Sequence, residues 1–288
     1  MTNNYRILLA AIIVIMMITG CKKQSVDNGA TSNNETNNLL CFTAEEDGAT
    51  IGMYINGTLT TIPNFEYSYD GNVWNQFNPG ATVVTLDKTG DKIYFRGDNP
   101  NGVNFYNSSN LYEPSYVSFK IKDKKVAVSG NIMSLIDPTC LLKRIPCQGC
   151  FFMLFNQTKI STAPELPATE LTDYCYFGMF AATTLTTAPK LPATVMADYC
   201  YSEMFAACDK LISAPELPAT SLAIGCYDYM FGSCTKLNNL KVYFTNWADF
   251  TNGWLIGVQS TGTFICPSTL PQVFDYAHIP EGWSVETF

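Results

Sequence analysis

The chain of 288 residues is acidic, with a formal net charge of −8; 47% of its residues are hydrophobic and 15% are charged. This composition is that of a globular protein with a sizeable core, and the length allows two domains. The acidity disfavours a nucleic-acid partner, because phosphate binding needs a basic surface.

Residues 1–20 have the features of a bacterial lipoprotein signal peptide. Arg6 supplies a basic start, and the apolar run Ile7–Ile18 is too short to span a bilayer of about 30 Å. The run leads into Thr19-Gly20-Cys21, which resembles a lipobox, so Cys21 is the expected lipid anchor. An ordinary signal peptide with a chance cysteine is the alternative.

A polar stretch, residues 21–39, is predicted to be a flexible tether because it contains too few apolar residues to order itself. Residues 40–137 then show short β segments separated by turn signals, which predict an antiparallel β-sandwich. Asn56-Gly57 is a strong hairpin signal between Ile51–Ile55 and Thr58–Ile62.

A second hairpin is predicted where Phe65–Tyr69 and Val73–Phe77 flank Asp70-Gly71-Asn72. The phrase from Ser68 to Trp74 also looks like the Asp-box turn of sialidase propellers. It occurs once, whereas a propeller needs repeated blades, so the hairpin turn is the preferred interpretation.

Between Cys150 and Leu240 the chain repeats itself at steps of 25, 25 and 26 residues. The block Cys-Tyr-x-x-Met-Phe begins at Cys175, Cys200 and Cys226, with a degenerate copy at Cys150. A second block, Ala-Pro-x-Leu-Pro-Ala-Thr, occupies 163–169, 188–194 and 214–220, with lysine in place of glutamate in the middle copy. A fixed period in this range predicts a solenoid of stacked units.

Each unit is predicted to have one helical and one extended half. Met196, Cys200 and Met204 form the i, i+4, i+8 stripe of a helix. Prolines such as Pro164 and Pro167 limit the paired strand to three or four residues, because they lack an N–H donor.

The motif Leu-x-x-Ala-Pro-x-Leu-Pro-Ala-Thr-x-Leu/Met-x-x-x-Cys-Tyr-x-x-Met-Phe-x-x-Cys, as in Leu185 to Cys208, resembles the BspA-like leucine-rich-repeat surface lipoproteins of anaerobic Gram-negative bacteria. The resemblance implies an all-β sandwich followed by a short α/β leucine-rich-repeat solenoid. That solenoid, of about four units, would occupy residues 138–244, with a C-terminal cap over 245–288. Members of this family are associated with adhesion to host or microbial surfaces.

Cysteines locked to the repeat period are most simply small core residues. A disulfide between stacked neighbours such as Cys208 and Cys234 stays open as an alternative. Cys147-x-x-Cys150 is compatible with redox or zinc chemistry, but Cys150 also belongs to a repeat column. A single histidine, His278, nearly excludes mixed Cys/His zinc sites and is expected to be structural.

No catalytic motif is present, so we expect no enzyme activity, no cofactor and no metal. A glycosidase remains a minor alternative, since paired carboxylates have no fixed sequence spacing.

The candidate ligand surface is a column of like positions. Glu165, Lys190 and Glu216 recur at the repeat step, so an acid–base–acid ladder is expected at a rung spacing of about 4.8 Å. Ser161 and Thr186 are assigned to the same surface. An exposed ion-pair stripe that aids solubility is the alternative.

Two further patterns have a binding interpretation and a simpler one. Arg96-Gly97-Asp98 spells an integrin-binding tripeptide and is expected on an exposed loop, although a strand followed by polar residues also explains it. A column of tyrosines is assigned to packing between rungs rather than to sugar stacking; its members are Tyr176, Tyr201 and Tyr227.

The expected function is non-catalytic binding or adhesion by a cell-surface lipoprotein, anchored to the outer membrane through its N-terminal lipid. The partner would be a host or microbial surface protein or glycan. The alternative is an accessory glycan-capture lipoprotein that serves nutrient uptake. The residues after the anchor are Lys22-Lys23-Gln24, where surface-exposed relatives often carry acidic residues. The sequence therefore leaves two alternatives for the anchored protein, the outer and the periplasmic face of the outer membrane.

Overall fold

A computed structural model describes residues 38–104, 114–247 and 250–288. These residues belong to one compact unit, Ser32–Phe288. The predicted signal peptide, Cys21 and the tether up to residue 37 lie outside the described residues. Within the described part of the chain, no helix is long and apolar enough to cross a membrane.

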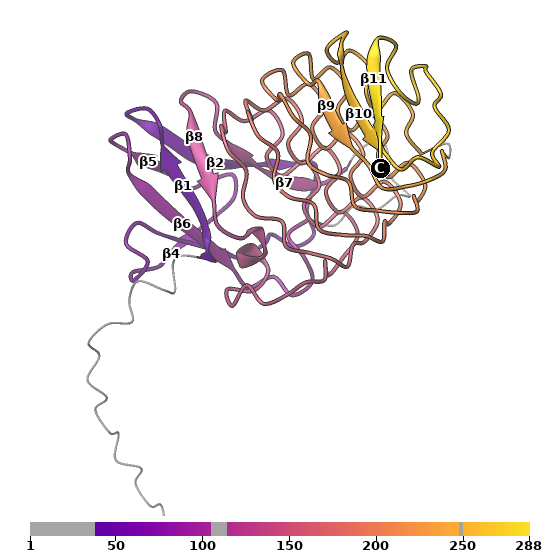
Figure 1. Ribbon diagram of the computed structural model, residues 1–288. Coiled ribbons are helices and arrows are strands. Elements are labelled where there is room, and N and C mark those ends of the chain that lie inside the picture. Colours follow the sequence, from indigo (N-terminus) through magenta and orange to yellow (C-terminus); the bar gives the residue numbers. More distant parts are fainter. Residues whose placement is uncertain (1–37, 105–113, 248–249) are drawn as a thin grey trace, which may run out of the picture. The chain divides into compact units, whose positions relative to one another are not determined.

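The N-terminal region forms two antiparallel sheets, consistent with the predicted β-sandwich (Figure 1). One sheet has five strands in the order β4-β3-β6-β1-β8, and the other has three in the order β5-β2-β7. The strands are β1 (Leu40–Ala44), β2 (Ala49–Asn56), β3 (Phe65–Ser68), β4 (Asn75–Phe77), β5 (Val83–Leu86), β6 (Lys92–Gly97), β7 (Tyr116–Lys120) and β8 (Val126–Ser129).

One of the two predicted hairpins is confirmed and the other is wrong. Strands β3 and β4 pair antiparallel around the Asp70 turn. Strand β2 instead pairs with β5 and β7, and the predicted strand Thr58–Ile62 does not form. Ile62 in that segment is 55% exposed, so a strand there would bury too little apolar surface to be stabilised.

A continuous core joins the sheets to the repeats. Phe42 of β1 contacts Phe119 of β7 at a ring-centroid distance of 4.9 Å, so the two sheets face each other. Phe119 stacks on Phe155 at 5.0 Å. The row then continues through Phe180, Phe205 and Phe231 at 5.6, 5.7 and 5.6 Å.

The α/β leucine-rich-repeat solenoid predicted for residues 138–244 is wrong. The described residues there contain no α-helix, and the fold as a whole is almost entirely β-structure and turns. Just before the repeats lies a short 3-10 helix, η3 (Ile132–Leu135). The segment around Met196–Met204, predicted to be helical, is a run of tight turns.

We call these turn segments of the repeats the turn face: residues 149–158, 174–183, 199–208 and 225–234. Every fourth residue there adopts a left-handed conformation, with φ of 56° at Tyr174, 55° at Gly178 and 55° at Ala182. A residue with positive φ interrupts the i→i−4 hydrogen bonding of an α-helix. The N–H groups between them instead bond three residues back, as from Phe177 to the Tyr174 carbonyl at 3.1 Å.

The remaining N–H groups of the turn face bond to the next repeat. Alternate residues of the second unit donate to the third unit over 2.7–3.0 Å. The five donors are Tyr174, Tyr176, Gly178, Phe180 and Ala182, and the acceptors are the carbonyls of Asp198, Cys200, Ser202, Met204 and Ala206. Every backbone N–H on this face from 174 to 182 therefore has a partner, as burial requires.

Large left-handed residues on the turn face lie over glycines of the following repeat. A Cβ added to Gly225 would overlap the ring of Tyr199. The same holds for Gly253 under the ring of Tyr229, where the shortest contact would be 2.7 Å. Glycine serves here both for its positive φ and for the space it leaves.

The C-terminal residues extend the stack with a parallel sheet of order β11-β10-β9 (Figure 1). Its strands are β9 (Asn239–Lys241), β10 (Gly262–Cys266) and β11 (Trp283–Thr287). Trp254 is fully buried and stacks on Tyr227 at 6.3 Å. Its indole N–H donates to the His278 carbonyl at 2.7 Å, which satisfies a polar group that burial would otherwise leave unpaired.

The repeats differ in length at one corner, where the turn face ends. Phe180 is five positions before Leu185, whereas Phe205 is six positions before Leu211. The longer corner contains Asp209 and Lys210, which are exposed and form an ion pair at 2.8 Å. The extra residue is thus accommodated at the surface.

Candidate functional site

The other side of each repeat carries the proline blocks, and we call it the proline face: residues 160–169, 185–194 and 211–220. It is anchored by apolar side chains that point inward in each unit. The buried members are Ile160, Leu166, Leu185, Leu191, Leu211 and Leu217. The charged residue at the same position of each block is exposed instead, as Glu165, Lys190 and Glu216 show.

The first and third units of the proline face are bonded to neighbouring segments of the chain. In the first unit, the Glu165 N–H donates to the Gly130 carbonyl at 2.7 Å, and the Ile132 N–H donates back to Glu165 at 3.1 Å. In the third unit, the Leu217 N–H donates to the Lys241 carbonyl of β9 at 3.0 Å.

The middle of the proline face is different. Among the described residues, one long backbone hydrogen bond joins its first two units, from the Thr186 N–H to the Ser161 carbonyl at 3.4 Å, and none joins the second unit to the third. Proline has no N–H to donate, so the strand ladder cannot continue through Pro189 and Pro192.

A hollow of about 460 Å³ opens where this ladder is interrupted, between the first two units. Its lining is mostly apolar, with one charge of each sign from neighbouring repeats. The lining residues are Ala163, Pro164, Glu165, Leu166, Pro167, Pro189, Lys190 and Pro192. An apolar concavity with a few polar groups is the usual form of a small ligand site.

The structure brings only part of the predicted ligand surface together. Glu165 and Lys190 line the same hollow and are both exposed. Thr186 is exposed but does not line the hollow. Ser161 does not line it either, and its hydroxyl oxygen is buried without a hydrogen-bond partner. Glu216 lies one repeat further on and also outside the hollow.

The predicted acid–base–acid ladder does not form. In the described part of the chain, Lys190 has no ion pair, and Glu216 pairs instead with Lys241 at 3.1 Å. The ladder prediction assumed hydrogen-bonded rungs, and the prolines remove those bonds between these units. The column does continue, because Lys241 lies one repeat step after Glu216, a member that the sequence reasoning missed.

Glu216 is engaged at the far end of the column. Its carboxylate accepts from Lys241 Nζ and from the Tyr243 hydroxyl, both at 3.1 Å. These two hydrogen bonds, the one from Lys241 first, lower the pKa of Glu216. Among the described residues, Glu165 and Lys190 therefore lack an ion pair, whereas Glu216 has one.

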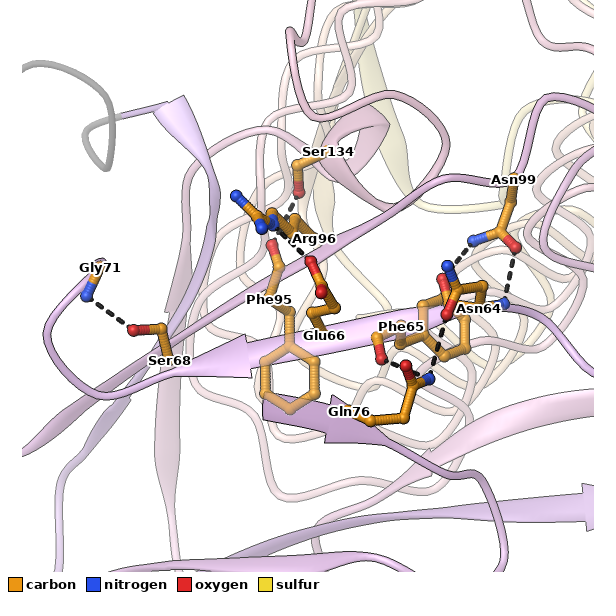
Figure 2. Close-up of polar contacts among 10 residues, drawn as sticks. All are labelled: Asn64, Phe65, Glu66, Ser68, Gly71, Gln76, Phe95, Arg96, Asn99 and Ser134. Atoms are coloured by element: carbon orange, nitrogen blue, oxygen red, sulfur yellow. Dashed lines mark hydrogen bonds and ion pairs between the residues drawn. The ribbon is translucent and has the colours of Figure 1, made fainter. Parts of the chain in front are cut away.

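The Arg-Gly-Asp tripeptide is not displayed on one loop. Arg96 and Gly97 belong to strand β6, where the Arg96 guanidinium bonds to Glu66 at 2.7 Å (Figure 2). The guanidinium also lies 3.9 Å from the centroid of the Trp74 ring. Gly97 is buried, and only Asp98 is exposed. The expected exposed loop is wrong for two of the three residues.

A polar cluster beside the tripeptide fixes the loop that follows β6 (Figure 2). The Asn99 side chain accepts from the Asn64 N–H at 2.8 Å and donates to the Asn64 and Leu135 carbonyls at 2.8 and 2.7 Å. Gln76 donates to the Asn64 side chain at 3.0 Å. These hydrogen bonds join segments of the fold to one another, so we assign them a structural role.

The Asp70 phrase forms the β3–β4 turn. Its carboxylate accepts from the Val73 and Asn72 N–H groups at 2.9 and 2.8 Å and from the Ser68 hydroxyl at 2.9 Å. These bonds, in that order, lower the pKa of Asp70. The hydrogen bonds that the Asp70 carboxylate accepts thus come from residues of its own turn.

The tyrosine column is buried, with Tyr176 and Tyr201 stacked at 5.8 Å and an interplanar angle of 3°.

The ten described cysteines are free, so the open alternative of a Cys208–Cys234 disulfide is not found. Burial raises the pKa of Cys175 to about 12, as expected for a core thiol. His278 bonds to Asp275 at 2.6 Å.

Comparison with family models, curated proteins and solved structures finds no match to this chain. Among the described residues, no group of three or more His, Cys, Asp or Glu side chains is arranged to hold a metal ion.

Proposed function

We propose that this protein is a non-catalytic, lipid-anchored binding protein that recognises a protein or glycan ligand at the cell surface with its proline face. The observation that carries the proposal is the hollow between the first two units, which is lined by two of the predicted ligand residues, Glu165 and Lys190. The repeat motif, which resembles BspA-like surface lipoproteins, supports the same role.

The chemistry of the hollow suits an extended ligand with both apolar and polar groups. Its prolines offer rigid apolar surface that loses no side-chain entropy on binding. The unpaired Lys190 ammonium supplies hydrogen-bond donors, and Glu165 supplies acceptors. Backbone carbonyls that lack a neighbouring donor are available to amide or hydroxyl groups of a ligand.

The anchor places this surface near a membrane. Lipid on Cys21 and the polar tether to residue 39 would hold the described unit at the outer membrane while leaving it free to reach a partner.

The test is binding of the full-length chain to a panel of host matrix proteins and to a glycan array. Lys190→Ala is expected to weaken binding about tenfold, since a hydrogen bond from a charged group contributes about 1.5–3 kcal/mol. Lys210→Ala is the matched control, because Lys210 is an exposed lysine at the corner, outside the hollow.

Equal binding by both variants would overturn the assignment of the proline face. Saturable binding to glycans without any binding to matrix proteins would favour the glycan-capture role over adhesion. Binding to matrix proteins that Lys190→Ala weakens would favour adhesion.

A further inference from the structure

Cys147 and Cys150 occupy the two ends of a tight turn at the start of the repeats. Gln148 and Gly149 form the turn, and Gly149 has a φ of 66°. Positive φ at the third position is typical of a type II turn, whose end Cα atoms lie within about 7 Å. Disulfide-bonded cysteines have Cα separations of about 4.4–6.8 Å, so the turn holds this pair in the right range.

The two sulfur atoms share one small space. A Cβ added to Gly102 would overlap Cys147 Sγ and would lie 3.4 Å from Cys150 Sγ. The Cys147 thiol donates to the Asn104 carbonyl, with its Sγ 3.1 Å from that oxygen. Both sulfurs therefore lie on the same side of the turn, next to Gly102.

The pair is asymmetric in accessibility and acidity. Cys147 is the one described cysteine that is not buried, whereas Cys150 is fully buried. The hydrogen bond from the Cys150 thiol lowers the pKa of Cys147. Burial, followed by that same hydrogen bond, raises the pKa of Cys150 well above its usual range.

We propose that Cys147 and Cys150 are a redox-active dithiol that forms a reversible disulfide with small disulfide oxidants, with Cys147 as the attacking group and Cys150 as the resolving group. An accessible thiolate next to a second thiol is the arrangement that thiol–disulfide exchange requires. This site is separate from the proline face and does not depend on the function proposed for it.

The exchange proceeds in two steps. The Cys147 thiolate attacks a sulfur of the oxidant RSSR, forming a mixed disulfide and releasing one thiolate RS⁻. Cys150 then loses its proton and attacks Cys147 Sγ, forming the internal disulfide and releasing the second RS⁻. The two cysteines lose two electrons in total, the oxidant gains them, and the two cysteine protons end on the two released thiols.

The other cysteines of the repeats have different surroundings. Cys208 Sγ and Cys234 Sγ lie 3.1 and 3.0 Å from the backbone carbonyls of Phe180 and Phe205, and both cysteines are fully buried. Cys175 and Cys200 are also fully buried. These thiols serve as internal controls in the same chain.

The experiment treats the reduced full-length chain, with Cys21→Ser to remove the predicted anchor thiol from the count, with 4,4′-dithiodipyridine and follows the released thiopyridone. We expect rapid release of two leaving thiols per chain, and mass spectrometry should find the tryptic peptide 145–159 two hydrogens lighter. That peptide contains Cys147 and Cys150 and no other cysteine. Dithiothreitol should restore its mass.

Two variants separate the roles. Cys150→Ser should release one leaving thiol and retain a thiopyridyl adduct on Cys147. Cys147→Ser should slow the rapid phase at least tenfold, because Cys150 is inaccessible. Rapid release that persists in Cys147→Ser, or a wild-type peptide 145–159 that keeps both thiols or a stable adduct, would overturn the proposal. The wild-type peptide decides the matter even if Cys150→Ser fails to fold.

Discussion

The turn face and the proline face have the same repeat period but are held by different interactions. On the turn face, five backbone hydrogen bonds and a row of stacked rings join each unit to the next. On the proline face, one long backbone hydrogen bond joins the first two units, and no backbone hydrogen bond joins the second to the third within the described residues. The comparison teaches that one face of a repeat can hold the units together while the other has almost no backbone hydrogen bonds between units.

The largest expected effect is loss of a ring from the turn-face core. Phe205 is fully buried between Phe180 and Phe231, so Phe205→Ala should lower the free energy of unfolding by about 3–5 kcal/mol. Urea denaturation of the full-length chain measures this. Val195→Ala, at a residue that is 73% exposed, is the control and should change stability by less than about 0.5 kcal/mol. Similar losses in both variants would contradict the assignment of cohesion to the turn face.

A smaller effect is expected from a glycine beneath a ring. Gly225→Ala places a Cβ at a φ of 55° and against Tyr199. The left-handed conformation alone costs about 1–2 kcal/mol, and the overlap adds to it.

A double-mutant cycle with Tyr199→Ala separates the two contributions, since it removes the overlap and leaves the conformational cost. Gly48→Ala is the control for conformation alone, because Gly48 has a φ of 74° and an added Cβ would have no atom within 4 Å. Equal penalties for Gly225→Ala with and without the Tyr199 ring would disprove the contact.

The smallest effect is expected on the proline face. Pro189→Ala should destabilise the chain by only about 0.4–1 kcal/mol, through the greater freedom of the unfolded chain, because no ladder bond depends on this position. The same denaturation assay measures it. A loss comparable to that of Phe205→Ala would mean that the proline face also holds the units together.

The burial of residues that recur at the repeat step was predictable from the sequence. The backbone conformation of the segments between them was not. Like residues at a fixed step stack on one another whatever the local backbone is, so the burial of Cys175, Tyr176 and Phe180 agrees with the sequence pattern. The helix prediction failed because a four-residue spacing is close to the 3.6-residue turn of a helix. Glycine occupies some of the left-handed positions, such as Gly149, Gly178 and Gly225, but segment 199–208, on which the helix was predicted, has none.

The candidate site was predictable to a similar degree. The column of Glu165 and Lys190 follows from the repeat, and its exposure follows from the neighbouring prolines. The hollow between them depends on how far apart two backbones lie once their hydrogen bonds are missing. That spacing has no counterpart in residue order, and neither does the pairing of Glu216 with Lys241.

The corner at Asp209 and Lys210 is a site where residues can be inserted into the chain. Because it absorbs one added residue while the ladders on either side keep their pairing, longer segments inserted there should leave the stack intact. A peptide grafted between these two residues would be displayed between the cohesive and the open face. New specificities could then be added to such a chain by lengthening corners, with the core residues left unchanged.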